Sequence, residues 1–272
     1  MTVHLPKFSK PFEIENFVVS VPVFEVHFGD INVKPSTFSV RSATGGISVN
    51  VGSCRIHYAT RVSSHHFHPQ NIEADKTDIR VNTGRIHGNF TVTESLALKT
   101  NTGSIVVNVS MFSNTIAPQH PPTSASIITN TGVIDTRFSL LAVDAKDQAL
   151  VPSGGSFLID TKSDTSGLRI KFDDAPVESA LTLTSKSSTG SVDVDLHPTY
   201  EGTFSLSSSV RSPVVNVKEE VEDPAGKGRD RSVKFVRARS HAVVGEVAWG
   251  DARIDGGRVD LKSDVGTPRL SL

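Results

Sequence analysis

The chain has 272 residues, a net charge of −1 and an apolar fraction of 37%. The length suits one large domain or two small ones. The near-neutral charge gives no electrostatic reason to expect a nucleic acid or an anionic membrane as a partner. A single cysteine, Cys54, excludes a fold that is held together by internal disulfides.

Residues 1–37 contain short apolar patches that are separated by Pro22. Proline cannot donate a hydrogen bond to a sheet ladder, so we predict edge strands that cap the remaining chain, residues 38–272. The opening MTVHLPKFSKPF lacks the apolar region of a secretory signal, and no run approaches 18 apolar residues. We therefore expect no signal peptide and no membrane span, which favours the cytoplasm by default, or the cell surface if a longer chain precedes Met1.

From residue 38 onward one pattern recurs, in which a bend such as Asn101-Thr102-Gly103 precedes apolar residues at every second position. Glycine and asparagine tolerate positive φ, so the triplet predicts a tight turn. The alternation predicts a strand with one buried face, here Ile105, Val107 and Val109. The glycine position of this pattern falls at residues 45, 84, 103, 132, 166, 190, 211, 245 and 266.

The intervals between these positions distinguish two all-β architectures. The shortest are 19 residues, from 84 to 103, and 21 residues, from 190 to 211 and from 245 to 266. Units of about twenty residues are too short for a propeller blade and suit one coil of a single-stranded β-solenoid. We predict such a β-solenoid of about nine coils over residues 38–272. A β-sandwich is the alternative, because it also shows alternation and glycine turns.

Polar residues at the bends have a structural interpretation. If the coils are in register, the amides of Asn82 and Asn101 stack and bond to each other, as in the Asn ladders of stacked β structures. We expect this ladder to continue through Asn130, and more weakly through Thr165 and Ser188.

Two N-glycosylation sequons begin at Asn89 and Asn108. They matter only if the chain is secreted, and both fall on predicted strands. We interpret them as chance occurrences.

Histidines gather in one segment that breaks the repeat. A metal site there would use His57, His65, His66 and His68, since imidazole is the commonest transition-metal ligand. Two of these histidines are adjacent, and no cysteine or nearby glutamate completes a ligand set. We therefore interpret residues 57–76 as a polar loop and expect no metal and no cofactor.

Catalytic signals are weak along the chain. There is no GxSxG nucleophile motif and no phosphate-binding glycine loop, and Cys54 is interpreted as a small buried residue. Arg169, Asp193 and Asp195 resemble the Arg and carboxylate set of β-helix polysaccharide lyases only if they face one another on neighbouring coils. The two aspartates also suit a solvent-facing strand.

The last part of the chain combines a charged loop with further strands. Residues 218–232 contain four acidic residues followed by three basic residues, and residues 233–249 predict two strands separated by a turn. Trp249 falls at an inward position, so we expect it to pack in the core.

Several of these stretches resemble a known family. The repeat at 79–109 and 181–196 is similar to a bacterial family of adhesin-like domains of unknown function, with strand–TxxG–strand units. A fungal branch of that family resembles residues 198–272, from PTYEGTFSL through VVGEVAWGD to GRVDLKSDVGTPRL. The resemblance implies a right-handed β-solenoid without an established enzymatic activity and with an adhesive role. This chain departs from the family where Arg211 replaces a turn glycine and where residues 57–76 and 110–126 interrupt the repeat.

These patterns together predict a non-enzymatic, adhesin-like β-solenoid. We expect it to bind a glycan or a protein partner through a flat strand face and its loops, without nucleic acid as a partner. The alternatives are a β-helix enzyme that degrades polysaccharide and a purely structural scaffold.

Overall fold

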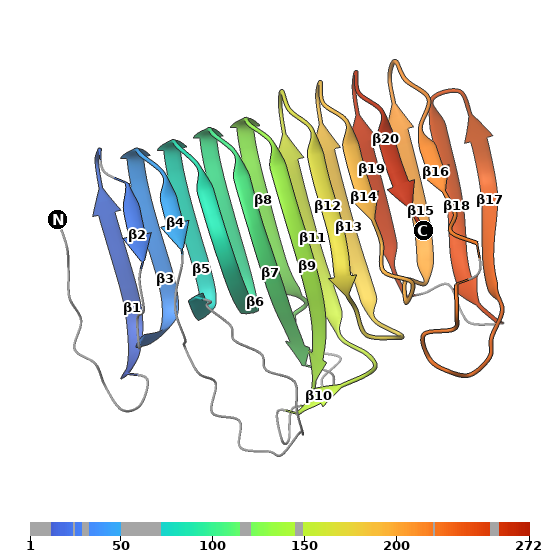
Figure 1. Ribbon diagram of the computed structural model, residues 1–272, viewed down its shortest axis with the longest axis horizontal. Coiled ribbons are helices and arrows are strands. Elements are labelled where there is room, and N and C mark those ends of the chain that lie inside the picture. The colour runs from blue at the N-terminus through green and yellow to red at the C-terminus, as the bar shows by residue number, and fades with distance from the viewer. Residues whose placement is uncertain are drawn as a thin grey trace.

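The computed structural model describes residues 12–23, 25–28, 33–49, 72–114, 121–144, 149–219, 221–250 and 256–272. Within these residues every regular element is a β-strand. The strands form one large, mostly parallel sheet that does not close on itself (Figure 1). The prediction of an all-β chain is therefore confirmed, and the alternative of an antiparallel β-sandwich is wrong.

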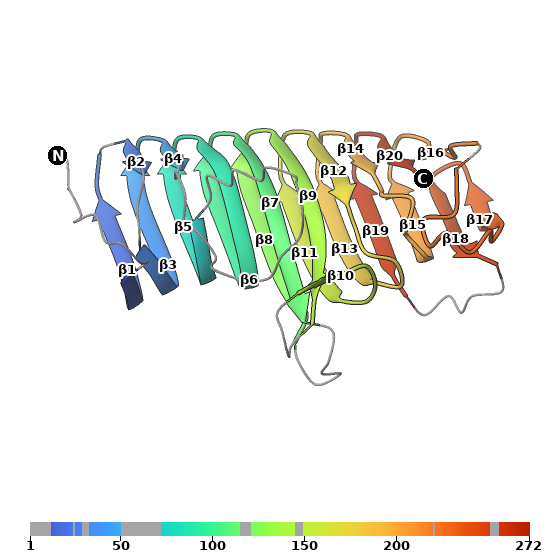
Figure 2. The same cartoon turned by 60° about the horizontal axis from the view of Figure 1, so that its bottom comes forward.

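Two series of parallel pairings run through the sheet, and β6 (Ile86–Thr102) belongs to both. In spatial order the first series consists of β1 (Phe12–Val21), β3 (Val33–Thr44), β5 (Ile72–Thr83), β6, β8 (Thr123–Thr131), β11 (Ser156–Ser163), β13 (Ala180–Ser187), β19 (Arg258–Ser263) and β15 (Gly202–Ser208). The second consists of β2 (Val26–Phe28), β4 (Ile47–Val49), β6, β7 (Ile105–Asn114), β9 (Ile134–Val143), β12 (Leu168–Asp174), β14 (Val192–Asp195), β20 (Pro268–Ser271) and β16 (Val214–Asn216). Figure 2 shows the two series as two layers that short bends join along one edge.

Antiparallel pairing is confined to three places among the described strands. The two-residue strand β10 (Leu150–Val151) pairs with β9. At one end of the molecule β18 (Ala242–Trp249) pairs with β15, and β17 (Arg231–Arg239) pairs with β18. The predicted pair of strands in residues 233–249 is thus confirmed as an antiparallel hairpin.

Chain order and spatial order differ at that end. The last strands of the chain, β19 and β20, do not lie at the edge of the sheet. β19 is parallel to β13 on one side and to β15 on the other, and β20 lies between β14 and β16 in the same way. In Figure 1 the red strands β19 and β20 therefore separate the yellow strands from the orange β15 to β18.

Neighbouring strands pair with equivalent residues opposite one another, so the apolar positions form continuous buried columns. Ile105, Val107 and Val109 expose at most 3% of their surface, which confirms the predicted inward face. Another column runs across the first series through Val40, Ile79, Leu98, Ile127, Thr161, Ser185, Leu261 and Leu206, all buried.

The stacked bends explain why glycine recurs before the strands. Gly103 has φ of +149°, and a methyl group on its Cα would overlap the carbonyl oxygen of Gly84 in the neighbouring bend. Only glycine combines such a φ with so close an approach of two backbones. At position 166 a serine stands where the repeat has glycine, and the neighbouring Gly190 stacks on Ser166 as the repeat predicts.

A column of buried hydroxyls precedes the bends and was not predicted from the sequence. Ser187 Oγ donates a hydrogen bond to the carbonyl of Ser166 at 2.9 Å and accepts one from the N–H of Gly190 at 2.9 Å. Thr100 Oγ1 donates in the same way to the carbonyl of Gly84 at 3.1 Å. The equivalent donors elsewhere are Thr129, Ser163, Ser208 and Ser263, each of which donates to a carbonyl of the bend stacked beside its own.

One predicted bend, at Gly245, is wrong. Gly245 lies inside β18 and not at a bend, because its missing side chain makes room for the ring of Phe204 on β15.

Towards the start of the chain, Pro22 ends β1 as predicted. Beyond it, β1 and β2 pair in parallel with β3 and β4 and continue both series.

Candidate functional site

The predicted Arg and carboxylate set lies on the outward face of the second series. Arg169 on β12 and Asp193 on β14 are register partners, so the structure brings them onto neighbouring strands. Each is bonded to a further neighbour, with Arg169 Nη1 3.6 Å from Asp135 Oδ2 and Arg269 Nη1 3.1 Å from Asp193 Oδ1. Asp195 is 2.8 Å from Lys218 Nζ. The carboxylates are therefore engaged in exposed ion pairs, and neither groove described below contains Arg169 or the two aspartates.

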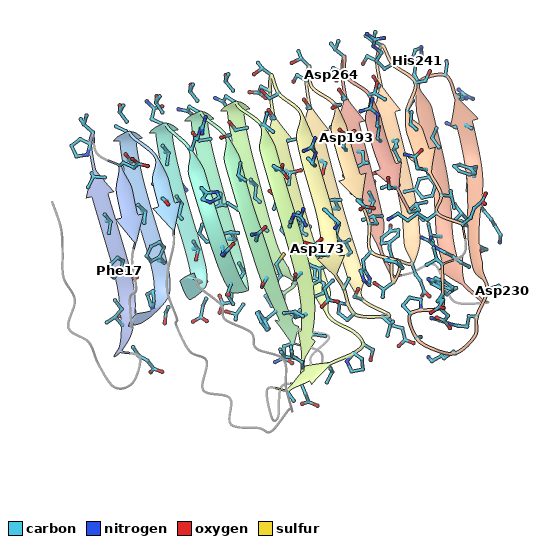
Figure 3. The ribbon with its side chains drawn as sticks, in the orientation of Figure 1. Phe17, Asp173, Asp193, Asp230, His241 and Asp264 are labelled. Carbon is cyan, nitrogen blue, oxygen red and sulfur yellow. The ribbon has the colours of Figure 1, made fainter. Side chains whose placement is uncertain are left out.

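Oppositely charged side chains lie next to one another on this face. One row across the second series reads Asp135, Arg169, Asp193 and Arg269 in register. Beside it, burial raises the pKa of the Asp173 carboxyl, but the ion pairs with Lys171 and Arg137 together outweigh burial, so the pKa is lowered. Asp173 and Asp193 are labelled in Figure 3. Opposite charges on adjacent strands stabilise a sheet, so a structural role accounts for this arrangement.

The outward face of the first series has a different charge pattern. One row carries cations at almost every strand, and we call it the basic row. Its members are Arg41, Arg80, Lys99, Lys162, Lys186 and Lys262, with Ile128 between Lys99 and Lys162. All six cations are exposed. The sequence signal for the row was a basic residue directly before the hydroxyl or apolar residue that precedes each bend, but the overall charge of −1 conceals it.

Two shallow grooves lie at the end of the sheet that contains β1, β3 and β5, the larger at the carboxyl ends of these strands and the smaller near their amino ends. The larger, of about 470 Å³, is lined by Ser20, Arg41, Arg80, Asn82, Lys99 and Asn101 among others, so it covers one end of the basic row. The smaller, of about 390 Å³, is lined by Glu13, Ile14, Glu15, Pro35, Ser36 and Asp75. The larger groove combines three cations with amide and hydroxyl groups, and the smaller one carries carboxylates.

The predicted asparagine ladder is present in part. Asn101 Nδ2 donates to Asn82 Oδ1 at 2.5 Å, which confirms the first step. Thr165 instead donates to the backbone carbonyl of Asn130, at 3.3 Å from its hydroxyl. Within the described residues no side-chain bond joins Asn130 to Asn101, so the amide ladder is shorter than predicted.

The two sequon asparagines also form a pair. Asn108 Nδ2 on β7 donates to Asn89 Oδ1 on β6 at 2.8 Å. The register places them opposite one another on the outward face of the second series. The two asparagines, expected only as chance sequons, therefore form a cross-strand hydrogen bond.

The charged loop between β16 and β17 is held mainly by the ion pairs of Arg229. Arg229 binds Asp223 through Nη2 at 2.9 Å and also reaches Glu201 at 3.2 Å. The hydrogen bond from Arg229 lowers the pKa of the Asp223 carboxyl, and backbone N–H groups of the loop add to this effect. Burial raises the pKa of Glu201, which the charge of Arg229 partly offsets. These contacts therefore order the loop, which its charged composition did not predict.

Trp249 packs as predicted, and it lies beside an unusual arginine. The indole is 1% exposed, and its Nε1 donates to the carbonyl of Pro198 at 3.0 Å. The guanidinium of Arg231 lies 5.8 Å from the indole ring centre, and its three nitrogens are buried without a hydrogen-bond partner. Burial lowers the pKa of Arg231. A cation over an aromatic face compensates part of this desolvation.

Other predicted site residues lie outside the described part of the chain. These are His57, His65, His66, His68 and Cys54. Within the residues that the structure does describe, no group of three or more His, Cys, Asp or Glu side chains has an arrangement that could hold a metal ion.

Comparison of the chain with family models, with curated proteins and with solved structures gave no match. Across the described residues, no helix has the length and apolar character that crossing a membrane requires.

Proposed function

We propose that this chain is a non-enzymatic, adhesin-like β-solenoid that binds a glycan or a protein partner through its flat strand faces and loops. The observation that carries the proposal is the register of the two strand series, whose outward side chains recur at the strand spacing of about 4.8 Å. Such a face offers polar groups in straight rows, which suits an extended partner.

The solenoid interpretation rests on how the two series are connected. One strand of the first series, a bend and one strand of the second series make one coil, and about nine such coils stack along the molecule. We assign a right-handed path because parallel crossover connections are right-handed in almost all proteins. The resemblance of residues 198–272 to adhesin-like domains supports the same architecture and an adhesive role.

We propose no catalytic role because the candidate carboxylates are engaged in ion pairs. A β-helix lyase needs an arginine and carboxylates that are free to reach a bound sugar. Here Asp193 and Asp195 are bonded to Arg269 and Lys218, and Arg169 is bonded to Asp135. These ion pairs favour binding over catalysis.

The test combines a glycan array and an affinity pull-down with an enzymatic assay. We expect saturable binding to a glycan or to a single protein partner, and no unsaturated ends after incubation with pectins and alginates. New unsaturated ends would establish the polysaccharide-degrading alternative. A blank array together with a clean pull-down would contradict binding and leave the scaffold alternative.

A further inference from the structure

The two outward faces of the molecule differ in how far their cations are paired with carboxylates. On the second series, one row alternates in sign from strand to strand, as Arg169 does with Asp135, and the adjacent cations Arg137 and Lys171 share the carboxylate of Asp173. On the first series, the basic row places cation beside cation, as in the register pair Arg41 and Arg80. Like charges opposite one another destabilise a sheet, so this row costs stability wherever no carboxylate neutralises it.

Part of the basic row is neutralised within the chain. Lys162 lies 3.2 Å from Asp164, Lys262 lies 3.6 Å from Asp264, and Arg80 lies 3.0 Å from Asp78. Arg41, Lys99 and Lys186 form no ion pair within the described residues. Two of these three free cations lie towards β1, with Arg80 between them.

The groove lies over this same end. It is lined by the side chains of Arg41, Arg80 and Lys99, and by Asn82, Asn101 and Ser20. No acidic residue is among its lining residues. Three cations at one-strand spacing, flanked by amide and hydroxyl groups, fit a ligand that carries both regularly spaced anions and hydroxyl groups.

We propose that the groove over Arg41, Arg80 and Lys99 binds a linear anionic polysaccharide, one that bears sulfate or carboxylate groups. The chain of the ligand lies along the row and across the strands, so that successive anions meet successive cations about 4.8 Å apart. The amides of Asn82 and Asn101 contact sugar hydroxyls. Binding removes the repulsion between the three cations.

A polysaccharide fits the groove better than a nucleic acid does. Proteins that bind single strands stack the bases on aromatic side chains. None of the groove's lining residues is aromatic. The polar groups present are those that bond to hydroxyls and to anionic oxygens.

The inference rests on the proposed binding function and specifies its ligand and its site. The experiment measures binding of a fluorescent heparin oligosaccharide to the full chain and to the variant Arg41→Gln, Arg80→Gln, Lys99→Gln. We expect the variant to bind at least about tenfold more weakly, and binding of the wild type to weaken as salt rises, because salt screens exposed charges. A neutral dextran fragment should not bind to either protein.

A matched control removes three charges from the other face, in the variant Arg137→Gln, Arg169→Gln, Lys171→Gln. This variant should bind heparin within about twofold of the wild type. A charge-retaining variant, Arg41→Lys with Arg80→Lys, should also keep binding, which separates loss of charge from loss of folding.

The outcomes separate this inference from the proposed function. Equal loss in both glutamine variants, or no loss in the groove variant, overturns the groove as the site. Tighter binding of a single-stranded oligonucleotide than of heparin overturns the assignment to polysaccharide. If the wild type binds glycans on an array but the groove variant binds them equally well, the proposed function stands and this inference fails. If the wild type binds no glycan and no protein, the proposed function itself fails.

Discussion

Arg229 donates two parallel hydrogen bonds to Asp223, from Nη2 to Oδ1 at 2.9 Å and from Nε to Oδ2 at 3.2 Å. The same carboxylate accepts backbone N–H groups of Ala225, Lys227 and Arg229. The Asp223 side chain is only 4% exposed. A bidentate pair of this kind is among the stronger polar contacts in proteins, so one aspartate fixes the shape of the loop between β16 and β17.

The first prediction concerns the pH dependence of this contact. The pKa of Asp223 is lower in the folded chain than in the unfolded chain, where an aspartate titrates near about 4. The folded state therefore binds fewer protons, and the contact stabilises it fully above that pH and progressively less as pH falls through the lower, folded pKa. We expect Asp223→Asn to lower the melting temperature at pH 7, and the difference from wild type to shrink below about pH 4.

The control for this prediction is Asp230→Asn, in the same loop. Asp230 is exposed, lies at the end of the loop in Figure 3, and takes part in the fold through its backbone carbonyl. Its substitution should leave the melting temperature unchanged at every pH. A melting-temperature difference for Asp223→Asn that persists undiminished at pH 2 would contradict the linkage to this carboxyl.

The second prediction concerns the hydroxyl column. Ser187→Ala removes one donor and one acceptor and leaves the Ser166 carbonyl and the Gly190 N–H without that partner. Leaving buried backbone groups unsatisfied costs about 1–3 kcal/mol, so we expect the free energy of unfolding to fall by that amount in chemical denaturation. Ser205→Ala makes the same deletion on the outward side of β15 and should change stability by less than about 0.5 kcal/mol. Equal effects of the two would contradict the role of the column.

The third prediction separates two reasons for a glycine. Gly103 and Gly226 both have positive φ, but an added methyl group meets the neighbouring bend only at Gly103 and has no atom within 4 Å at Gly226. We expect Gly226→Ala to cost roughly 1–2 kcal/mol, the cost of a left-handed backbone conformation alone. Gly103→Ala should cost clearly more, because two stacked bends must separate. Similar unfolding free energies for the two variants would mean that the bends can shift apart freely.

The sequence predicts the local structure of this fold well, for a physical reason. A glycine bend fixes where each strand begins, and alternation fixes which side chains face inward, so the burial of Ile105 and Val107 follows from local pattern alone. Gly245 shows the limit of that reasoning. A glycine before alternating apolar residues looks the same whether it makes a bend or makes room for Phe204.

The candidate site was harder to predict than the strands. The basic row exists only once the strands are in register, because Arg41 and Lys262 are far apart in the chain and the total charge is −1. The same holds for the ion pair of Asp193, whose partner Arg269 lies 76 residues later in the chain, on β20. Residue types were visible in the sequence, but neighbours across strands were not.

The order of the strands was also hidden from the sequence, and it leads to the last prediction. β19 and β20 come last in the chain yet each has a parallel partner on both sides, so their removal leaves a gap inside the stack. We expect deletion of residues 256–272 to detach β15 to β18 from β13 and β14. Trp249, the single tryptophan, is buried on β18 and reports on this event. Its fluorescence should shift to the red and become quenchable by iodide.

Deletion of residues 1–28, which removes β1 and β2 at the opposite end, should leave the emission of Trp249 as in the full chain. An unchanged emission after deletion of residues 256–272 would mean that β15 can pair directly with β13, and that the inserted strands are dispensable for that end of the sheet.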